Sequence, residues 1–126
     1  MRILIDTHIL IWFLEGNESL AKSRQELLSE IGNDVFVSIG SLWEIAIKLS
    51  LGKLRTKNSL NEIIIQIESE NIKILPISPE HVSHVESLPF HHRDPFDRIL
   101  ISQAQVDGLS VMSSDRAFSD YEVELL

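Results

Sequence analysis

Short apolar runs alternate with longer segments in which apolar residues recur at helical spacing, and this alternation predicts the order of the elements. A short run rich in β-branched residues and bounded by polar ones is typical of a buried parallel strand. Four such runs are present, and a weaker one lies near the end of the chain. The predicted strands are Arg2–Ile5, Asp34–Ser38, Ile72–Leu75 and Leu109–Met112, with Tyr121–Leu125 as a weak fifth.

The segments between these runs carry helix start and stop signals. Ser59-Leu60-Asn61-Glu62 is a capping box, and prolines at 79 and 95 stand where a first helical turn favours them. The predicted helices cover 7–14, 19–32, 41–50, a segment from 60, a short segment from 79, and 95–108. Strands that alternate with helices predict an α/β fold with a mostly parallel sheet of four or five strands, covered on both faces. The length of 126 residues fits one domain, residues 1–126.

Four acidic residues stand where these elements begin or end. Asp6 follows the first strand, Glu44 opens an apolar helical stretch, Asp97 precedes another, and Asp115 follows the fourth strand. Because the carboxyl ends of parallel strands meet at one edge of a sheet, we expect the four side chains to converge there. Carboxylates about 4 Å apart repel by about 4 kcal/mol at an effective dielectric of 20. Convergence therefore predicts a site for a hard divalent cation.

Each acid also has a purely structural explanation. Asp6 and Asp115 could cap the segments that follow them, and Ser41 to Glu44 could form a capping box. Asp97 could favour the dipole of a helix that Asp94 caps. A cap contributes about 1 kcal/mol, which is too little to offset the repulsion of converging acids, so the joint pattern favours the metal site. Asp94 is excluded from that site, because the proline behind it makes capping a sufficient explanation.

Composition and charge narrow the possible environments and partners. There is no cysteine, which excludes disulfides and cysteine-ligated zinc. The N-terminal segment becomes acidic too early for a signal peptide, and no apolar run approaches the roughly 18 residues of a membrane helix, so a cytoplasmic protein is expected. The net charge of −8 is unusual for a nucleic-acid binder and would suit a basic protein partner. However, the only charged residues between Glu44 and Glu62 are basic, and that stretch could follow a phosphate backbone.

Other candidate sites are weaker. Adjacent His91 and His92 have poor spacing for one metal site and are interpreted as loop residues. Neither a glycine-rich phosphate loop nor a Ser-His-Asp motif is present. The aromatic residues Trp12, Phe13 and Trp43 are expected in the core, although Ile9, Trp12 and Phe13 could also line an apolar groove for a partner helix.

Four segments, in order, resemble the PIN-domain family, and specifically the VapC-type toxins of bacterial toxin–antitoxin pairs. They span nearly the whole chain, and Gly52-Lys53-Leu54 and Ile101-Ser102-Gln103-Ala104 add to the likeness. The segments are Ile5-Asp6-Thr7-His8-Ile9-Leu10-Ile11-Trp12, Val37 to Lys48 around Trp43-Glu44, His92-Arg93-Asp94-Pro95-Phe96-Asp97-Arg98, and Ser113-Ser114-Asp115. One departure is Ser113, where many relatives have threonine.

The resemblance implies a three-layer α/β/α domain and an endoribonuclease that uses Mg²⁺ or Mn²⁺. It also implies RNA as substrate, inhibition by a cognate antitoxin, products with 5′-phosphate and 3′-hydroxyl ends, and a homodimer. Carried over by position, Asp6, Glu44 and Asp97 are the principal metal-site and catalytic acids, with Asp115 as the fourth, acting directly or through water.

Further residues are assigned to supporting roles. The hydroxyl residues expected to orient ligands or water are Thr7, Ser38 and Ser113. The candidate phosphate contacts are Lys48, Lys53, Arg98 and Arg116. Two alternatives stay open: a DNA nuclease with similar metal chemistry, and an inactive PIN-like regulator that binds a basic partner through its acidic pocket.

Overall fold

Four parallel strands form the central sheet in a computed structural model that describes residues 1–126. They are β1 (Arg2–Ile5), β2 (Asp34–Ser38), β3 (Lys73–Leu75) and β4 (Ser110–Met112). The order across the sheet is β3-β2-β1-β4, and every neighbouring pair is parallel. The predicted mostly parallel sheet is confirmed with four strands. The weak fifth strand is wrong, because segment 121–125 forms only an isolated bridge between Leu125 and Val111.

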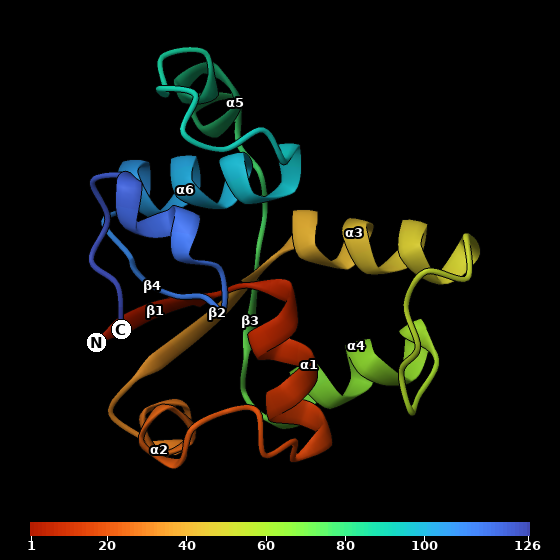
Figure 1. Cartoon of the computed structure of the whole chain (residues 1–126). Helices are drawn as coiled ribbons and strands as arrows, with labels where there is room; N and C mark the ends of the chain where they lie inside the picture. Colours follow the sequence, from red (N-terminus) through yellow and green to blue (C-terminus); the bar gives the residue numbers. More distant parts are fainter.

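Helices cover both faces of the sheet, as the alternation of elements predicted. Figure 1 shows α1, α2 and α4 on one side and α5 and α6 on the other, while α3 extends from the carboxyl end of β2. The bounds are α1 (Thr7–Glu15), α2 (Lys22–Ser29), α3 (Ile39–Ser50), α4 (Leu60–Ser69), α5 (Pro79–Val85), α6 (Pro95–Asp107) and the 3-10 helix η1 (Arg116–Asp120). None of these helices is both long enough and apolar enough to cross a membrane.

The alternation of side chains along β1 divides the core into two clusters. Ile3 and Ile5 point to one face and pack with the residues of α1, α2 and α4. Leu4 points to the other face and packs with residues of α6, including Leu100 and Ile101. All three β1 side chains are completely buried. The central strand therefore joins both layers and gives its carboxyl end a fixed position.

Several helices begin and end at the capping residues that the sequence predicted. Ser59 and Glu62 form the predicted capping box of α4. Asp94 caps α6 by accepting hydrogen bonds from the backbone N–H groups of Phe96 and Asp97. Gly108 ends α6 in the left-handed region, at φ 66°, where glycine carries no steric cost.

Two sequence-based predictions about apolar residues are wrong, and a third is confirmed in its main part. Segment 19–32 is helical only over Lys22–Ser29, so Ile31 lies outside the helix and is fully exposed rather than packed. Trp43 is 63% exposed and does not belong to the core, because α3 turns this side chain outward. Trp12 and Phe13 are half-buried and pack against the core, as expected, and Ile9 is completely buried, so Ile9 does not line the apolar groove that was the alternative.

The strand order places one crevice at the carboxyl edge of the sheet. All four strands run in the same direction, so Asp6 after β1 and Ser113 after β4 emerge side by side. The chain moves from β1 to β2 and β3 on one side and then crosses to β4 on the other. Such a reversal of strand order opens the crevice in which α/β proteins bind ligands.

Candidate active site

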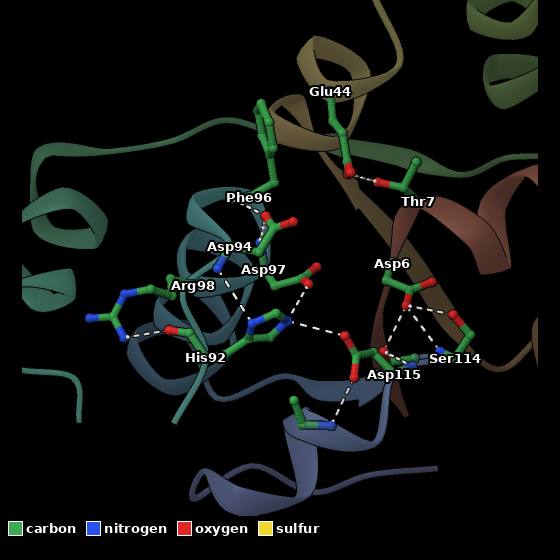
Figure 2. Close-up of polar contacts among 12 residues, drawn as sticks. Asp6, Thr7, Glu44, His92, Asp94, Phe96, Asp97, Arg98, Ser114 and Asp115 are labelled. Atoms are coloured by element: carbon green, nitrogen blue, oxygen red, sulfur yellow. Dashed lines mark hydrogen bonds and ion pairs between the residues drawn. The ribbon is translucent and has the colours of Figure 1, made fainter. Parts of the chain in front are cut away.

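A pocket of about 560 Å³ lies at this carboxyl edge, and its lining contains no hydrophobic residue. The four predicted acids all contribute to it, from the end of β1, from α3, from α6 and from the segment after β4. Figure 2 shows their side chains directed toward a common space. The lining residues are Asp6, Thr7, His8, Glu44, Lys48, His92, Asp94, Asp97, Ser114, Asp115 and Arg116. The predicted convergence of the acids is therefore confirmed.

Asp6 both caps α1 and lines the pocket. Its Oδ1 accepts a 2.8 Å hydrogen bond from the backbone N–H of Ile9 and so caps α1. Its Oδ2 accepts from the Ser113 hydroxyl at 2.6 Å and from the Ser114 backbone N–H at 3.0 Å. The residue is 4% exposed. Donors from three neighbouring residues thus hold this carboxylate in the pocket lining.

Glu44 lies inside α3 rather than at its start. Ser38 is the N-cap of this helix, so the alternative in which Ser41 and Glu44 form a capping box is wrong. Glu44 Oε1 accepts a 2.6 Å hydrogen bond from the Thr7 hydroxyl, and Oε2 pairs with Lys48 Nζ at 2.7 Å. Glu44 is 6% exposed. The hydrogen bond to Glu44 raises the pKa of Lys48, which keeps this amine protonated beside the pocket.

Asp97 carries the clearest electrostatic strain in the pocket. Its pKa is raised from 3.8 to about 7, first by burial and then by nearby Asp94, Glu44 and Asp6, while His92 lowers it. The pocket lining holds five carboxylates but only two permanently charged cations, Lys48 and Arg116. The raised pKa of Asp97 is consistent with a buried carboxylate that lies among other negative charges.

The donor set fits a hard divalent cation. Carboxylate oxygens are the ligands that Mg²⁺ and Mn²⁺ prefer, and the excess of acids over cations supplies the negative charge that such an ion would offset. Asp6, Glu44, Asp97 and Asp115 would hold it. The oxygen of Asp115 that faces the pocket is Oδ2, because Oδ1 accepts from the Ala117 backbone N–H and caps η1.

Two of the three predicted supporting hydroxyls contact an acid. Thr7 donates to Glu44 and Ser113 donates to Asp6, each at 2.6 Å. Ser38 has a different partner: its Oγ accepts from the Gly40 backbone N–H at 3.0 Å and caps α3. Ser38 therefore helps to place Glu44 through the helix start instead of orienting a ligand directly.

The predicted phosphate contact at Arg98 is wrong. This side chain is only 5% exposed, and its guanidinium donates to the carbonyl oxygens of Val85, Leu88, Pro89 and His92 and to the Tyr121 hydroxyl. The N–H groups of Arg98 are therefore bonded inside the protein and do not face a substrate. They hold the loop before α6 in place. Of the other three candidates, Lys48 and Arg116 line the pocket and Lys53 does not.

His92 is the site residue that the sequence interpretation missed. Its Nε2 lies 2.8 Å from Asp97 Oδ2 and 3.1 Å from Asp115 Oδ2. The nearest ligand atoms of these three residues all lie within 4.8 Å of one another. His8 also lines the pocket. The sequence did contain a sign of this role. His92 lies two residues before Asp94, the cap of α6, and α6 begins at the sheet edge where the acids meet.

One comparison with known proteins identifies a family. The family model of the PIN domain matches residues 3–124. No protein in the curated set matches the sequence significantly.

Solved structures share the fold over the whole chain. A chain in the structure of VapBC2 from Rickettsia felis bound to a promoter DNA fragment has a TM-score of 0.73, with 14% identity and coverage of 100% of this chain and 98% of that chain. DNA-bound VapBC from Salmonella typhimurium gives 0.67, with 15% identity and coverage of 100% and 97%. A toxin–antitoxin complex from Klebsiella pneumoniae gives 0.64, with 18% identity and coverage of 98% and 95%. At these identities the likeness shows a common fold.

Proposed function

The chain belongs to the PIN domain family, and from this premise we propose that it is a divalent-metal-dependent endoribonuclease, the toxin of a toxin–antitoxin pair. PIN domains are typically nucleases that depend on divalent metal ions. The observation that carries the proposal is the meeting of Asp6, Glu44, Asp97 and Asp115, from four separate elements, in one pocket without hydrophobic lining.

Hydrogen bonds from neighbouring residues hold two of the acids in place before a substrate binds. Ser113 and Ser114 fix Asp6, while Thr7 and Lys48 fix the two oxygens of Glu44. When bound, a divalent ion supplies Lewis-acid stabilisation of phosphate charge and lowers the pKa of water. Fixed carboxylates need little reorganisation to receive it, which is the advantage of a preorganised electrostatic site.

Cations at the rim would guide the RNA backbone to this pocket. Lys48 and Arg116 stand among the acids, and both present positive charge on the pocket lining. A phosphodiester could contact them while its scissile phosphate faces the acid cluster. By family likeness, hydrolysis leaves 5′-phosphate and 3′-hydroxyl ends.

The direct test is cleavage of RNA and DNA substrates in competition, with Mg²⁺ or Mn²⁺, and with a chelator. We expect RNA cleavage that stops on chelation and returns when metal is restored. The Asp97→Asn variant is the matched control, since it removes one negative charge from the pocket and keeps the shape of the side chain. Preferred cleavage of DNA would favour the DNA nuclease, and binding of a basic partner without cleavage would favour the inactive regulator.

An antitoxin partner is proposed from the same family relationship. One structural neighbour is described as a toxin–antitoxin complex. Here the pocket carries five carboxylates, and the whole chain has a net charge of −8, so a partner with basic side chains at the pocket would be complementary. Co-purification from the native host should recover a basic protein that suppresses cleavage, and its removal should restore activity.

A further inference from the structure

His92 occupies a specific place between two acids that belong to different elements. Asp97 lies in the first turn of α6, and Asp115 follows β4. The His92 imidazole is the one group that contacts both, through Nε2 at 2.8 Å and 3.1 Å, as Figure 2 shows. The side chain is about four-fifths buried, with 20% exposure. The link between these two acids therefore passes through a side chain that the proposed metal set does not include.

The backbone around His92 is anchored independently of its imidazole. Its N–H donates to the Tyr121 hydroxyl at 2.9 Å, and its carbonyl oxygen accepts from the Arg98 guanidinium at 3.4 Å. Tyr121 and Arg98 are both 5% exposed, and they also hydrogen-bond to each other. The loop before α6 is thus built on a buried framework that directs His92 toward the acids.

A hydrogen bond to the second ring nitrogen determines what Nε2 can offer. The Asp94 backbone N–H donates to His92 Nδ1 at 3.4 Å, so Nδ1 acts as an acceptor. In the neutral ring the proton is then on Nε2, which donates toward the two carboxylates. A nitrogen that carries this proton has no lone pair for a metal ion. The geometry therefore makes His92 a donor to metal-binding carboxylates rather than a ligand itself.

The shared contact with His92 keeps the two carboxylates close together. The ligand atoms of Asp97 and Asp115 lie within 4.8 Å of one another. Two negative side chains on separate elements would otherwise move apart, because each repels the other. The shared donor keeps the two carboxylates close together, and each carboxylate keeps oxygen lone pairs that a single N–H does not use.

We propose that His92 is a positioning residue that holds Asp97 and Asp115 together for the divalent ion without ligating it. This inference rests on the proposed metal-dependent function. It adds the residue that positions two of the four acids, Asp97 and Asp115. Groups that hydrogen-bond to metal ligands commonly change metal affinity by about 10- to 100-fold when they are removed.

The test measures Mn²⁺ binding by calorimetry, independently of cleavage. We expect His92→Ala to weaken binding about tenfold or more, and His92→Gln, whose amide N–H can replace the Nε2 donor, to restore most of it. His91→Ala is the matched control and should bind as the native protein does, because His91 packs against the Tyr121 ring. Unchanged or tighter binding by His92→Ala would overturn the proposal.

Two further measurements separate the remaining possibilities. Electron paramagnetic resonance of the Mn²⁺-loaded protein should show no directly bound imidazole nitrogen, and such a nitrogen coupling would overturn the positioning role. If the native protein binds no Mn²⁺, the proposed function fails, and a crystal structure of His92→Ala then decides the present inference. Asp97 and Asp115 should separate in that structure, and their retention at the native spacing would overturn it.

Discussion

The Ser113 hydroxyl donates a 2.6 Å hydrogen bond to Asp6 Oδ2, although 107 residues separate the two in the chain. The same hydroxyl oxygen accepts the Asp115 backbone N–H at 2.9 Å. One small side chain therefore links the acid after β1 to the acid after β4. This contact adds a side-chain link to the backbone pairing that places β1 beside β4.

Replacing Ser113 by alanine should weaken both folding and metal binding. The variant leaves the buried Asp6 carboxylate without its shortest donor, and hydrogen bonds to charged groups contribute about 1.5–3 kcal/mol. We expect a loss of this size in the free energy of unfolding, measured by urea denaturation. Ser119→Ala is the control, because its exposed hydroxyl bonds only to the nearby Arg116 carbonyl. Equal losses in both variants would contradict a specific role for Ser113.

Neutralising two of the acids should change stability in opposite directions. Asp6 accepts from three separate donors, so Asp6→Asn places an amide N–H against at least one of them and should cost about 1–3 kcal/mol. Asp97 is buried among other acids, and its raised pKa shows that its charge is disfavoured. Asp97→Asn should therefore raise the free energy of unfolding at pH 8 by an amount of order 1 kcal/mol.

Thermal and urea unfolding in the presence of a chelator measure this difference without interference from bound metal. Both variants should nevertheless lose cleavage, because each removes a proposed metal ligand. If both variants are destabilised equally, favourable contacts of the Asp97 carboxylate outweigh the repulsion from the nearby acids. Normal cleavage by either variant would remove that acid from the proposed site.

Stability should depend on pH through Asp97. Its pKa rises from 3.8 in the unfolded chain to about 7 in the folded protein, so the folded state holds the proton more tightly. The contribution is present below about pH 4 and is lost as the pH rises to about 7. Without metal, the free energy of unfolding should therefore fall over this window more steeply in the native protein than in Asp97→Asn.

Metal binding should show the opposite pH trend. A proton on Asp97 competes with the ion for the same carboxylate, so Mg²⁺ affinity should rise as the pH increases through about 7. Calorimetric titrations at several pH values would measure this rise and the accompanying release of protons. A flat affinity between pH 6 and 8 would show that Asp97 is already ionised in the folded protein, or that it does not bind the ion.

The basic residues of the pocket should control the salt dependence of RNA binding. Lys48→Met removes a cation that lines the pocket, and each phosphate contact on a single strand contributes about 0.7 to the slope of log affinity against log salt. We expect weaker binding and a slope reduced by about that amount. Lys53→Met is the matched control, because Lys53 lies outside the pocket lining.

Equal changes in the Lys48 and Lys53 variants would contradict an assignment based on the pocket. Arg98 gives a further contrast. Because its guanidinium is buried among carbonyl oxygens, Arg98→Met should unfold or loosen the loop before α6 instead of selectively changing the salt slope.

Interpretation of the sequence succeeded where the signal was local. The β-branched runs became the four strands, and the Ser59 to Glu62 segment became a capping box. The start of α3 was misplaced, because Ser38 and Ser41 are both possible caps and only the strand before them decides which is used. Trp43 was misplaced for a related reason: apolar character indicates a buried position only when the helix faces the core.

The positions of the acids along the chain, together with a rule for parallel sheets, were enough to predict that Asp6, Glu44, Asp97 and Asp115 meet, because strand direction alone brings those edges together. The contacts of each side chain required the tertiary structure. Arg98 and His92 lie six residues apart in one motif, yet burial turns the first inward to carbonyl oxygens while the second faces two acids. Hydrogen-bond geometry depends on distances of a few tenths of an ångström, and those distances result from the packing of α6, β4 and the loop before α6.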